Sequence, residues 1–315
     1  METKALVLSG GSIKGAFQAG AVKAVIEKGF FPKILYGISV GSLNSTFINH
    51  EAGKQDLPYE QLDWINIKDN LIKFWKENVK QPSDLVNKRG YLKLIIDVLF
   101  GKFNGLTDTA PLRKMVNRVI SLETLRQSKL IHRVGAVNIS NGNIVYADPN
   151  VEENFIDYII ASTAIPIVMP ASLIGGQADK PFFDGGLRDV APLKVAIQNG
   201  ADSIVAILCQ PPQLENEPFN YQNLPKLAER MTDIMVNEIV NNDIDLLNKV
   251  NRFLPVDGSR AVAGPYAGKR KIKLCVIRPS KNINVDITKF TEDDITKMIE
   301  LGYQTAQEAL ENADI

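Results

Sequence analysis

Cysteine and histidine are scarce in this sequence of 315 residues, with two of each. Cys209 and Cys275 lie inside apolar runs and form no Cys-x-x-Cys pair, which argues against a disulfide framework and against a zinc site. An excess of positive charge is also absent, because Lys and Arg together number 36, as do Asp and Glu. Nucleic-acid-binding domains are usually basic, so we expect no nucleic acid as partner. We also expect no metal and no other cofactor.

The sequence also lacks a recognisable export or membrane segment. Residues 1–11 show no basic start followed by a long apolar stretch, as a cleaved signal would. The longest uncharged run, residues 158–178, is interrupted by Pro166 and Pro170. Lipid-exposed backbone could not satisfy its hydrogen bonds through two such breaks, so we interpret the run as buried protein. We expect a cytoplasmic protein that makes at most peripheral contact with a membrane.

Two consecutive segments near the N-terminus combine a short apolar strand, a glycine turn and a helix. Residues 4–8 form an apolar run that ends in a glycine pair, and small and apolar residues then recur at helical spacing over 16–26. Residues 34–38 repeat the pattern and lead into a helical segment at 40–49. Two such units indicate a parallel sheet with helices on its faces.

The rest of the chain continues this α/β pattern. In the middle of the chain we predict two helices within 64–104 that are split near Pro82, a β-hairpin of 134–139 and 144–147 around Asn141-Gly142, and a helix at 153–164. A third strand-turn-helix unit follows from 181–183 through 192–199, with a strand at 203–209 and a loop at 210–223. The C-terminal part is predicted to form a helix at 224–253, a strand at 271–277 and a helix at 292–312. No repeat or linker is visible. We therefore expect a single domain over 1–315, with a helical insertion at about 64–104 and a C-terminal extension at about 224–315.

The segment 64–104 differs in character from its surroundings. It holds both tryptophans and eight Lys or Arg residues against four Asp or Glu, interspersed with apolar clusters. One interpretation is a surface that rests on an anionic membrane and gates an acyl pocket. The alternative, which we weigh equally, is a packed pair of amphipathic helices with a solvated basic face.

A possible nucleophile occurs in Gly37-Ile38-Ser39-Val40-Gly41. In a Gly-x-Ser-x-Gly elbow a strand turns sharply into a helix and raises the serine hydroxyl above the sheet, and the flanking positions must lack side chains. The motif alone is weak evidence, because Ser39 could be a small residue in a glycine-rich loop. The strand before it and the helix after it favour the elbow.

Histidine would be the usual base beside such a serine, but neither histidine is well placed. If residues 40–49 are helical, the rise per residue leaves His50 about 16 Å from Ser39. His132 lies just before a strand, with no glycine turn to direct it to the sheet edge. A Ser-His-Asp triad is therefore poorly supported.

Asp184 is the carboxylate that stands out. It follows the apolar pair Phe182-Phe183 and precedes two glycines, so it lies where a strand ends. Open α/β sheets gather their active groups at the carboxyl ends of parallel strands. Partial burial would raise the pKa of Asp184 and make it a better proton acceptor. The alternative is an ordinary turn-forming Asp-Gly.

The first glycine turn spans residues 10–15 and reads Gly-Gly-Ser-Ile-Lys-Gly. Acyl transfer places negative charge on a carbonyl oxygen, and N–H groups exposed at a glycine turn and a helix N-terminus can stabilise it. A nucleotide-binding loop is disfavoured, because the turn lacks a Gly-Lys-Ser/Thr ending and the spacing of a Gly-x-Gly-x-x-Gly fingerprint. We predict an oxyanion hole.

Four blocks together resemble the patatin-like phospholipases. They occur in the order Gly10-Gly11-Ser12-Ile13-Lys14-Gly15, Gly37-Ile38-Ser39-Val40-Gly41, Ala161-Ser162-Thr163-Ala164-Ile165-Pro166 and Asp184-Gly185-Gly186. The combination is far more specific than any one block, and the resemblance covers residues 4–210. It implies a three-layer α/β/α fold with a mostly parallel central sheet.

By matching position, the resemblance implies a Ser-Asp dyad with Ser39 as nucleophile and Asp184 as base, which would let a histidine-poor chain act as an esterase. It assigns the oxyanion hole to amides near Gly10, Gly11 and Ser12, and it gives Lys14 the role of fixing that loop. The glycines that it implies as supporting residues are Gly15, Gly37, Gly41, Gly185 and Gly186.

Two positions depart from the family pattern. Ser12 replaces a third glycine in the first block, although a backbone donor survives any side chain. Residues 187–192 read Leu-Arg-Asp-Val-Ala-Pro, where the family commonly has asparagine before the proline. The first departure could narrow the oxyanion loop, and the second bears on the substrate-side loops more than on the dyad.

We therefore predict a serine hydrolase that cleaves fatty-acyl esters of phospholipids or related lipids through an acyl-enzyme. A soluble carboxylesterase or thioesterase for short or carrier-bound acyl groups is a second hypothesis. A third is a non-catalytic interaction protein on the same fold.

Overall fold

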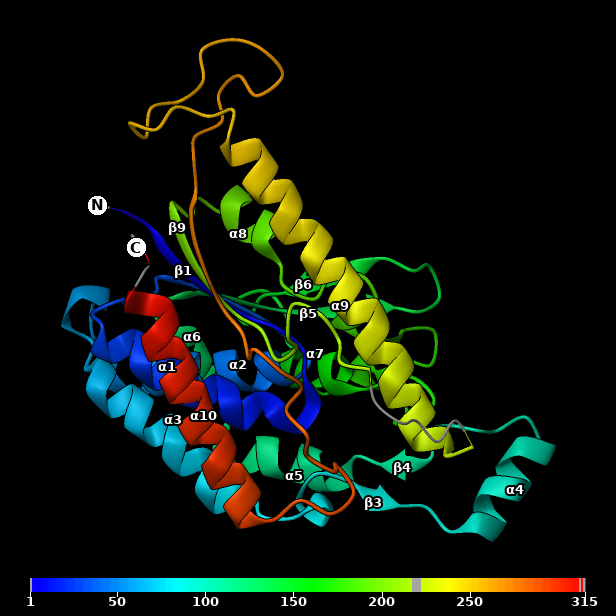
Figure 1. Ribbon diagram of the computed structural model, residues 1–315. Coiled ribbons are helices and arrows are strands. Elements are labelled where there is room, and N and C mark those ends of the chain that lie inside the picture. The colour runs from blue at the N-terminus through cyan, green and yellow to red at the C-terminus, as the bar shows by residue number, and fades with distance from the viewer. Residues whose placement is uncertain (1, 217–221, 312, 314) are drawn as a thin grey trace.

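A central sheet organises the chain, and the computed structural model describes residues 2–216, 222–311, 313 and 315 (Figure 1). The strands are β1 (Lys4–Leu8), β2 (Ile34–Ile38), β3 (Asn87–Lys88), β4 (Thr107–Asp108), β5 (Ile131–Asn138), β6 (Ile144–Ala147), β7 (Ser172–Leu173), β8 (Pro181–Asp184), β9 (Ser203–Ile207) and β10 (Lys273–Ile277). The longer helices are α1 (Gly15–Glu27), α2 (Val40–Gln55), α3 (Trp64–Asn78), α4 (Tyr91–Leu99), α5 (Ala110–Val119), α6 (Leu122–Gln127), α7 (Phe155–Thr163), α8 (Leu193–Gln198), α9 (Leu224–Asn251) and α10 (Glu292–Glu311). Residues 217–221 of the predicted loop and Asn312 of the predicted last helix lie outside the described residues.

The sheet is parallel at its centre and antiparallel at one side. Its strand order among the described residues is β10-β9-β1-β2-β5-β8-β7, with β6 also paired to β5. The strands β10, β9, β1, β2 and β5 run parallel, as the repeated strand-turn-helix pattern predicts. The hairpin predicted around Asn141-Gly142 is present, since β6 pairs antiparallel with β5.

One part of the predicted topology is wrong. Residues 181–183 were expected to begin a third unit of the parallel sheet, but β8 runs antiparallel to β5. The strand preference of Pro181-Phe182-Phe183 is local and carries no information on direction, which depends on how the long connection from β6 through α7 returns to the sheet. The sheet is therefore mixed, although it is mostly parallel.

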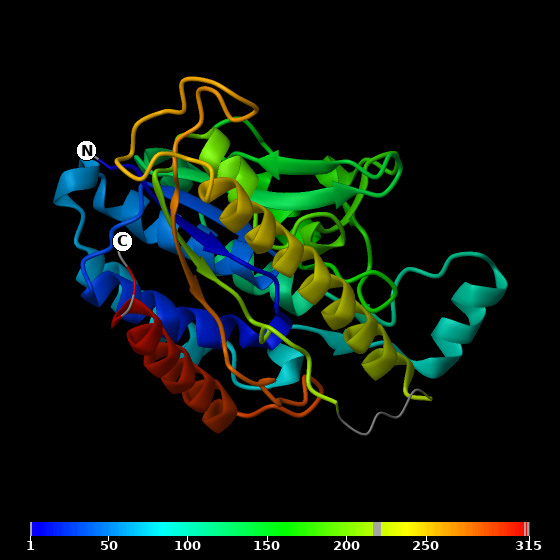
Figure 2. The same cartoon turned by 45° about the horizontal axis from the view of Figure 1, so that its top comes forward.

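Both faces of the sheet are covered by helices, which makes three layers (Figures 1 and 2). The alternation of β1 places Leu6 and Leu8 in the core beneath α1, α2, α3 and α10, whereas Ala5 and Val7 belong to the smaller core beneath α8 and α9. The red α10 lies along the blue α1 in Figure 1. A Cβ atom at Gly20 of α1 would lie 1.8 Å from the carbonyl oxygen of Ile299, so that only glycine allows this approach.

The segment 64–104 divides into two parts with opposite environments. Helix α3 buries Ile67, Leu71 and Trp75 in the main core, which is the packed amphipathic helix of the second interpretation. Helix α4 buries no residue. It projects away from the body of the protein at the lower right of Figure 1. The two helices therefore do not form a packed pair.

Candidate active site

Ser39 lies at the turn between β2 and α2, as the elbow motif predicts. Its backbone has φ 54° and ψ −128°, a left-handed conformation that is costly for a residue with a Cβ atom and that persists only where the surroundings impose it. A Cβ atom at Gly37 would lie 2.2 Å from the carbonyl oxygen of Gly41, and one at Gly41 would lie 2.2 Å from that of Leu8. The close approach of the backbones therefore accounts for both flanking glycines.

Ser162 of α7 forms a hydrogen bond with the backbone of this turn. The Ser39 N–H donates to Ser162 Oγ at 2.9 Å, and the Ser42 hydroxyl donates to the Ser39 carbonyl oxygen at 2.6 Å. Ser162 has no solvent exposure. Sequence reasoning gave this residue no role, although a serine inside the apolar run of α7 is a signal that a buried polar group there has a partner.

We expect Ser162→Ala to loosen the elbow. The variant leaves the buried Ser39 amide without an acceptor, which is expected to lower the free energy of unfolding by about 1–3 kcal/mol. A small misplacement of the Ser39 hydroxyl would lower kcat/KM by roughly 10- to 100-fold. Denaturant melts and ester hydrolysis would measure the two effects. Thr163→Ala is the matched control, because the Thr163 hydroxyl bonds only to the Ile160 carbonyl oxygen of its own helix; equal losses in both variants would contradict this role of Ser162.

The antiparallel pairing of β8 brings Asp184 to the level of Ser39. On one side of β5, Gly135 lies opposite Ile38, the last residue of β2, and on the other side Ala136 lies opposite Asp184. The strand end of β8 therefore reaches the elbow from the direction opposite to that expected for a parallel strand. A bond from the Asp184 N–H to the Ala164 carbonyl oxygen, at 3.0 Å, fixes the position.

The Asp184 carboxyl group is buried beside the Ser39 hydroxyl. The two residues are 8% and 6% exposed and line the same pocket. Burial raises the pKa of Asp184 to about 6, and hydrogen bonds from the Ser39 side chain and the Gly186 amide limit the rise. The bond from the Gly186 N–H to Oδ1 measures 2.7 Å. Ser39 and Asp184 thus lie together in one buried pocket.

The first glycine turn faces the same pocket through Gly10, Gly11 and Ser12. Among the hydrogen bonds of the described residues, none has the amide of any of these three as its donor. A Cβ atom at Gly10 would lie 3.1 Å from Ser39 Cβ, which shows how closely the turn passes the elbow. Ser12 has φ 53°, so it adopts the left-handed conformation that the glycine of the family pattern would enter more easily. The turn thus presents uncommitted N–H groups beside the serine.

The residues predicted to support the site lie where these turns closely approach neighbouring elements. The ammonium of Lys14 lies 3.9 Å from a carboxyl oxygen of Asp233 on α9, so it connects the turn to that helix. A Cβ atom at Gly15 would lie 2.2 Å from the Val40 side chain, and one at Gly185 would lie 2.4 Å from the Gly135 carbonyl oxygen. The catalytic, oxyanion and supporting roles of all the site residues stay predictions.

The pocket above Ser39 is small, with a volume of about 60 Å³. One wall comes from Ile165, Pro166 and Leu187, and Gln210 closes it near the first turn. The other wall belongs to α9, which contributes the side chains Thr232, Asp233, Met235 and Val236. Sequence reasoning predicted this helix but not its place at the pocket, because an amphipathic pattern does not indicate which distant residues the helix will contact.

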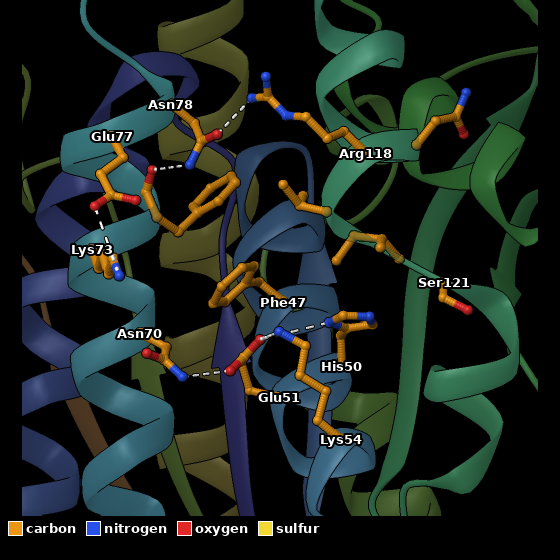
Figure 3. A pocket seen from close by; sticks show the side chains of 14 residues that line it. Phe47, His50, Glu51, Lys54, Asn70, Lys73, Glu77, Asn78, Arg118 and Ser121 are labelled. Carbon is orange, nitrogen blue, oxygen red and sulfur yellow. Dashed lines mark hydrogen bonds and ion pairs between the residues drawn. The ribbon is translucent and has the colours of Figure 1, made fainter.

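Neither histidine lines this pocket. His132 is buried in β5, where burial lowers its pKa to about 3 and its Nε2 lies 3.2 Å from Ser45 Oγ. His50 lines a separate cleft of about 510 Å³ (Figure 3). Figure 3 shows Glu51 there, contacted by Lys54 and Asn70. Burial raises the pKa of Glu51, but hydrogen bonds from His50, Lys54 and Asn70 outweigh it and bring the pKa to about 2. Glu51 is therefore held ionised by the neighbours that it contacts in this cleft.

Within the described part of the chain, no group of three or more His, Cys, Asp or Glu side chains is arranged to hold a metal ion. None of the described helices combines the length and the apolar character that crossing a membrane requires.

The fold and the site define a three-layer α/β protein with a serine elbow and a facing carboxyl group. The family model of the patatin-like phospholipases matches residues 6–197. The chain therefore belongs to the patatin-like phospholipase family. The match includes all four of the sequence blocks that carry the resemblance and ends before α9 and α10.

The individual similar proteins match this chain either over a short segment or at low sequence identity. Triacylglycerol lipase 5 of Saccharomyces cerevisiae is 36% identical over 81 residues, which are 25% of this chain and 10% of the yeast protein. The structure of VipD from Legionella pneumophila is 12% identical with a TM-score of 0.43, and the alignment covers 99% of this chain and 67% of VipD. Human GIVD cytosolic phospholipase A2, in complex with methyl gamma-linolenyl fluorophosphonate, is 13% identical with a TM-score of 0.46, covering 98% of this chain and 59% of the human one.

Proposed function

We propose that this protein hydrolyses fatty-acyl ester bonds of phospholipids or related lipids, with Ser39 as nucleophile and Asp184 as general base. The observation that supports the proposal most strongly is the meeting of three groups in one pocket: the elbow serine, the buried carboxyl group and the amides of residues 10–12. Membership of the patatin-like phospholipase family supports a lipid acyl hydrolase.

In the proposed reaction the Ser39 hydroxyl attacks the acyl carbonyl carbon while Asp184 accepts its proton. The oxyanion that forms receives hydrogen bonds from the amides of the first turn. Collapse of the tetrahedral intermediate breaks the ester bond, and the leaving alcohol takes the proton from Asp184. Water then attacks the acyl-enzyme with Asp184 again as base, which releases the fatty acid and restores Ser39.

The electrostatics of the pocket suit this sequence of steps. A base is most effective when its pKa lies near the working pH, and a value of about 6 leaves Asp184 mostly ionised at neutral pH yet able to hold a proton transiently. Ser39 also caps the N-terminus of α2, where the helix dipole favours the negative charge of the transition state.

The substrate is proposed from the lining and size of the pocket. Its apolar walls suit an acyl chain, but ligand pockets usually measure roughly 300–1,000 Å³, so a pocket of about 60 Å³ holds only the reacting end of such a substrate. We infer that α9 shifts when a long chain binds. Since the substrate belongs to a bilayer, we place the activity at the cytoplasmic surface of a membrane.

The small pocket also gives a specific reason to retain the second candidate, a carboxylesterase or thioesterase for short acyl groups. Initial rates on nitrophenyl esters of two to sixteen carbons, on a long-chain acyl thioester and on a diacyl phospholipid would separate the candidates. We expect kcat/KM to rise with chain length and fatty acid to be released from the phospholipid. A profile that peaks at the shortest esters, with no release from phospholipid, would support the second candidate instead.

A fluorophosphonate probe tests whether the site is catalytic at all. Such probes phosphonylate activated serines, so we expect one labelled peptide, and mass spectrometry should place the modification on Ser39. A folded protein that stays unlabelled would favour the non-catalytic interaction protein.

A further inference from the structure

The segment 87–108 forms a projection that we call the finger. Strands β3 and β4 pair antiparallel at its base, and α4 forms its tip. The Arg89 guanidinium pairs with Asp97 of α4 and donates to the carbonyl oxygens of Asn104 and Gly105, at 3.2 and 2.8 Å. These bonds tie the two sides of the finger together, so its tip is held in place by its own polar contacts.

The tip of the finger is an amphipathic helix whose apolar side chains are mostly exposed, with Lys93 and Asp97 one turn apart on its polar side. An exposed contiguous apolar surface marks an interaction site. The exposed fractions reach 87% for Tyr91 and 76% for Leu99. The exposed large apolar side chains of the finger are Tyr91, Leu92, Ile95, Ile96, Val98, Leu99, Phe100 and Phe103.

The finger also carries positive charge. Lys88, Lys93 and Lys102 are exposed, and none of the ion pairs between described residues involves them. The acidic side chain within the tip, Asp97, is neutralised by Arg89. The finger therefore combines the exposed apolar face of an amphipathic helix with three exposed lysines, which is the combination that binds the interface of an anionic bilayer.

The base of the finger is attached to the loop that lines the candidate active site. The Leu106 N–H donates to the Ile167 carbonyl oxygen at 3.0 Å, and both the N–H and the hydroxyl of Thr107 donate to that of Val168, at 2.9 and 2.8 Å. The same loop contributes Ile165 and Pro166 to the pocket. In both Figures 1 and 2 the finger projects beside the first turns of α9, the helix that forms the opposite wall.

Helix α9 also exposes large apolar side chains in its first half. Met231, Ile234 and Met235 are 55%, 52% and 43% exposed there, and Met235 also lines the pocket.

We propose that the finger is the surface by which this protein docks on anionic lipid bilayers, with α4 lying in the interface and the pocket held against the bilayer. Its nine residues are too few to span the hydrocarbon core, so an interfacial position is what its length allows. A second copy of the chain is a poorer occupant, because a symmetric contact would bring the lysines of two fingers together. The docking goes beyond the proposed hydrolysis and does not require it.

Binding to vesicles of ether-linked lipids tests this surface, because an acyl hydrolase cannot cleave them. Wild type is expected to sediment with vesicles that contain about one third ether-linked phosphatidylglycerol, and to bind pure ether-linked phosphatidylcholine at least tenfold more weakly. The triple variant Leu92→Glu, Ile95→Glu, Leu99→Glu should lose binding at least tenfold. A matched triple variant, Leu246→Glu, Val256→Glu, Val262→Glu, changes equally exposed apolar residues outside the finger and should bind like wild type.

Charge reversal gives a second, independent comparison. Lys88→Glu, Lys93→Glu, Lys102→Glu should weaken binding to the anionic vesicles at least tenfold. Lys73→Glu, Lys76→Glu, Lys80→Glu changes the net charge by the same amount on and just after α3, where Lys73 and Lys80 pair with Glu77 and Glu292. This control should bind nearly as well as wild type, since the lysines of the finger, and not the net charge of the protein, attract the lipid.

Several results would overturn the docking surface. They are a wild type that binds neither vesicle, finger variants that bind like wild type, and equal losses in finger variants and controls. A wild-type dimer that the finger variants convert to monomers, without vesicle binding, would assign the surface to a second copy. Hydrolysis of a dissolved short-chain ester, measured in parallel, should be unchanged in the finger variants. Failure of docking and failure of the proposed chemistry therefore give different results.

Discussion

Ser39→Ala is expected to lower the turnover of acyl esters by roughly 10⁴-fold or more, because the reaction loses the atom that forms the acyl-enzyme. The fold should remain, since alanine keeps the Cβ atom and the backbone bond to Ser162 Oγ. Steady-state hydrolysis of a long-chain ester and covalent capture by a fluorophosphonate would measure the loss. Thermal melting would show that the variant is folded.

Ser203→Ala provides the matched control for this experiment. Ser203 is fully buried in the sheet, and its hydroxyl has no hydrogen-bond partner among the described residues. Removing it should leave turnover and labelling within about twofold of wild type, because the change touches neither the pocket nor a buried bond. Residual turnover of Ser39→Ala comparable to that of this control would refute the assignment of Ser39 as nucleophile.

Asp184→Asn is expected to lower kcat/KM by roughly 10³-fold or more, since an amide cannot accept the proton of Ser39. In wild type the rate should rise about tenfold per pH unit below the pKa of about 6 and level off above it. The variant should lack this inflection. Rates between pH 4.5 and 8.5, measured for both proteins, test the assignment; an unchanged inflection near pH 6 in the variant would show that another group is the base.

The same substitution should make the protein more stable. The folded-state pKa of Asp184 is raised from 3.8 to about 6, so ionising the carboxyl group opposes folding. This penalty is absent below the unfolded value near 3.8 and complete above about 6. At pH 7 Asp184→Asn should therefore gain about 1–3 kcal/mol in the free energy of unfolding, and the gain should disappear near pH 4. Urea melts at both pH values would show a variant that is less active and more stable, and a loss at pH 7 would contradict the sign.

Much of the site could be predicted because its parts are local. Gly37, Ser39 and Gly41 follow a strand and precede a helix, and the backbone conformation of such a turn depends on a few consecutive residues. The strands at 4–8 and 34–38 were predicted to the residue, since a short, mostly apolar run that leads into a glycine-rich turn leaves little choice. Because neither of the two histidines is well placed beside Ser39, Asp184 is the candidate base that the sequence indicates.

The long-range arrangement could not be predicted from such local signals. The direction of β8 depends on a connection of more than thirty residues between β6 and β8, and no residue in the strand encodes it. Two further features are contacts between distant segments. One is the contribution of α9 to the pocket wall, and the other is the hydrogen bond between Ser39 and Ser162. The basic, aromatic character of 64–104 was visible, but only the packing of α3 shows that the unpartnered surface belongs to α4 alone.

The attachment of β8 to β5 rests on three residue pairs, from Asn138 opposite Phe182 to Ala136 opposite Asp184. Side chains alternate between the faces of a sheet, so a slip of one residue along this short ribbon would turn the carboxyl group away from the serine without disturbing the elbow. The proposed activity could therefore be lost without any change in a residue of the candidate site. A change of one residue in the length of the turn before β8 would be enough to separate Asp184 from Ser39.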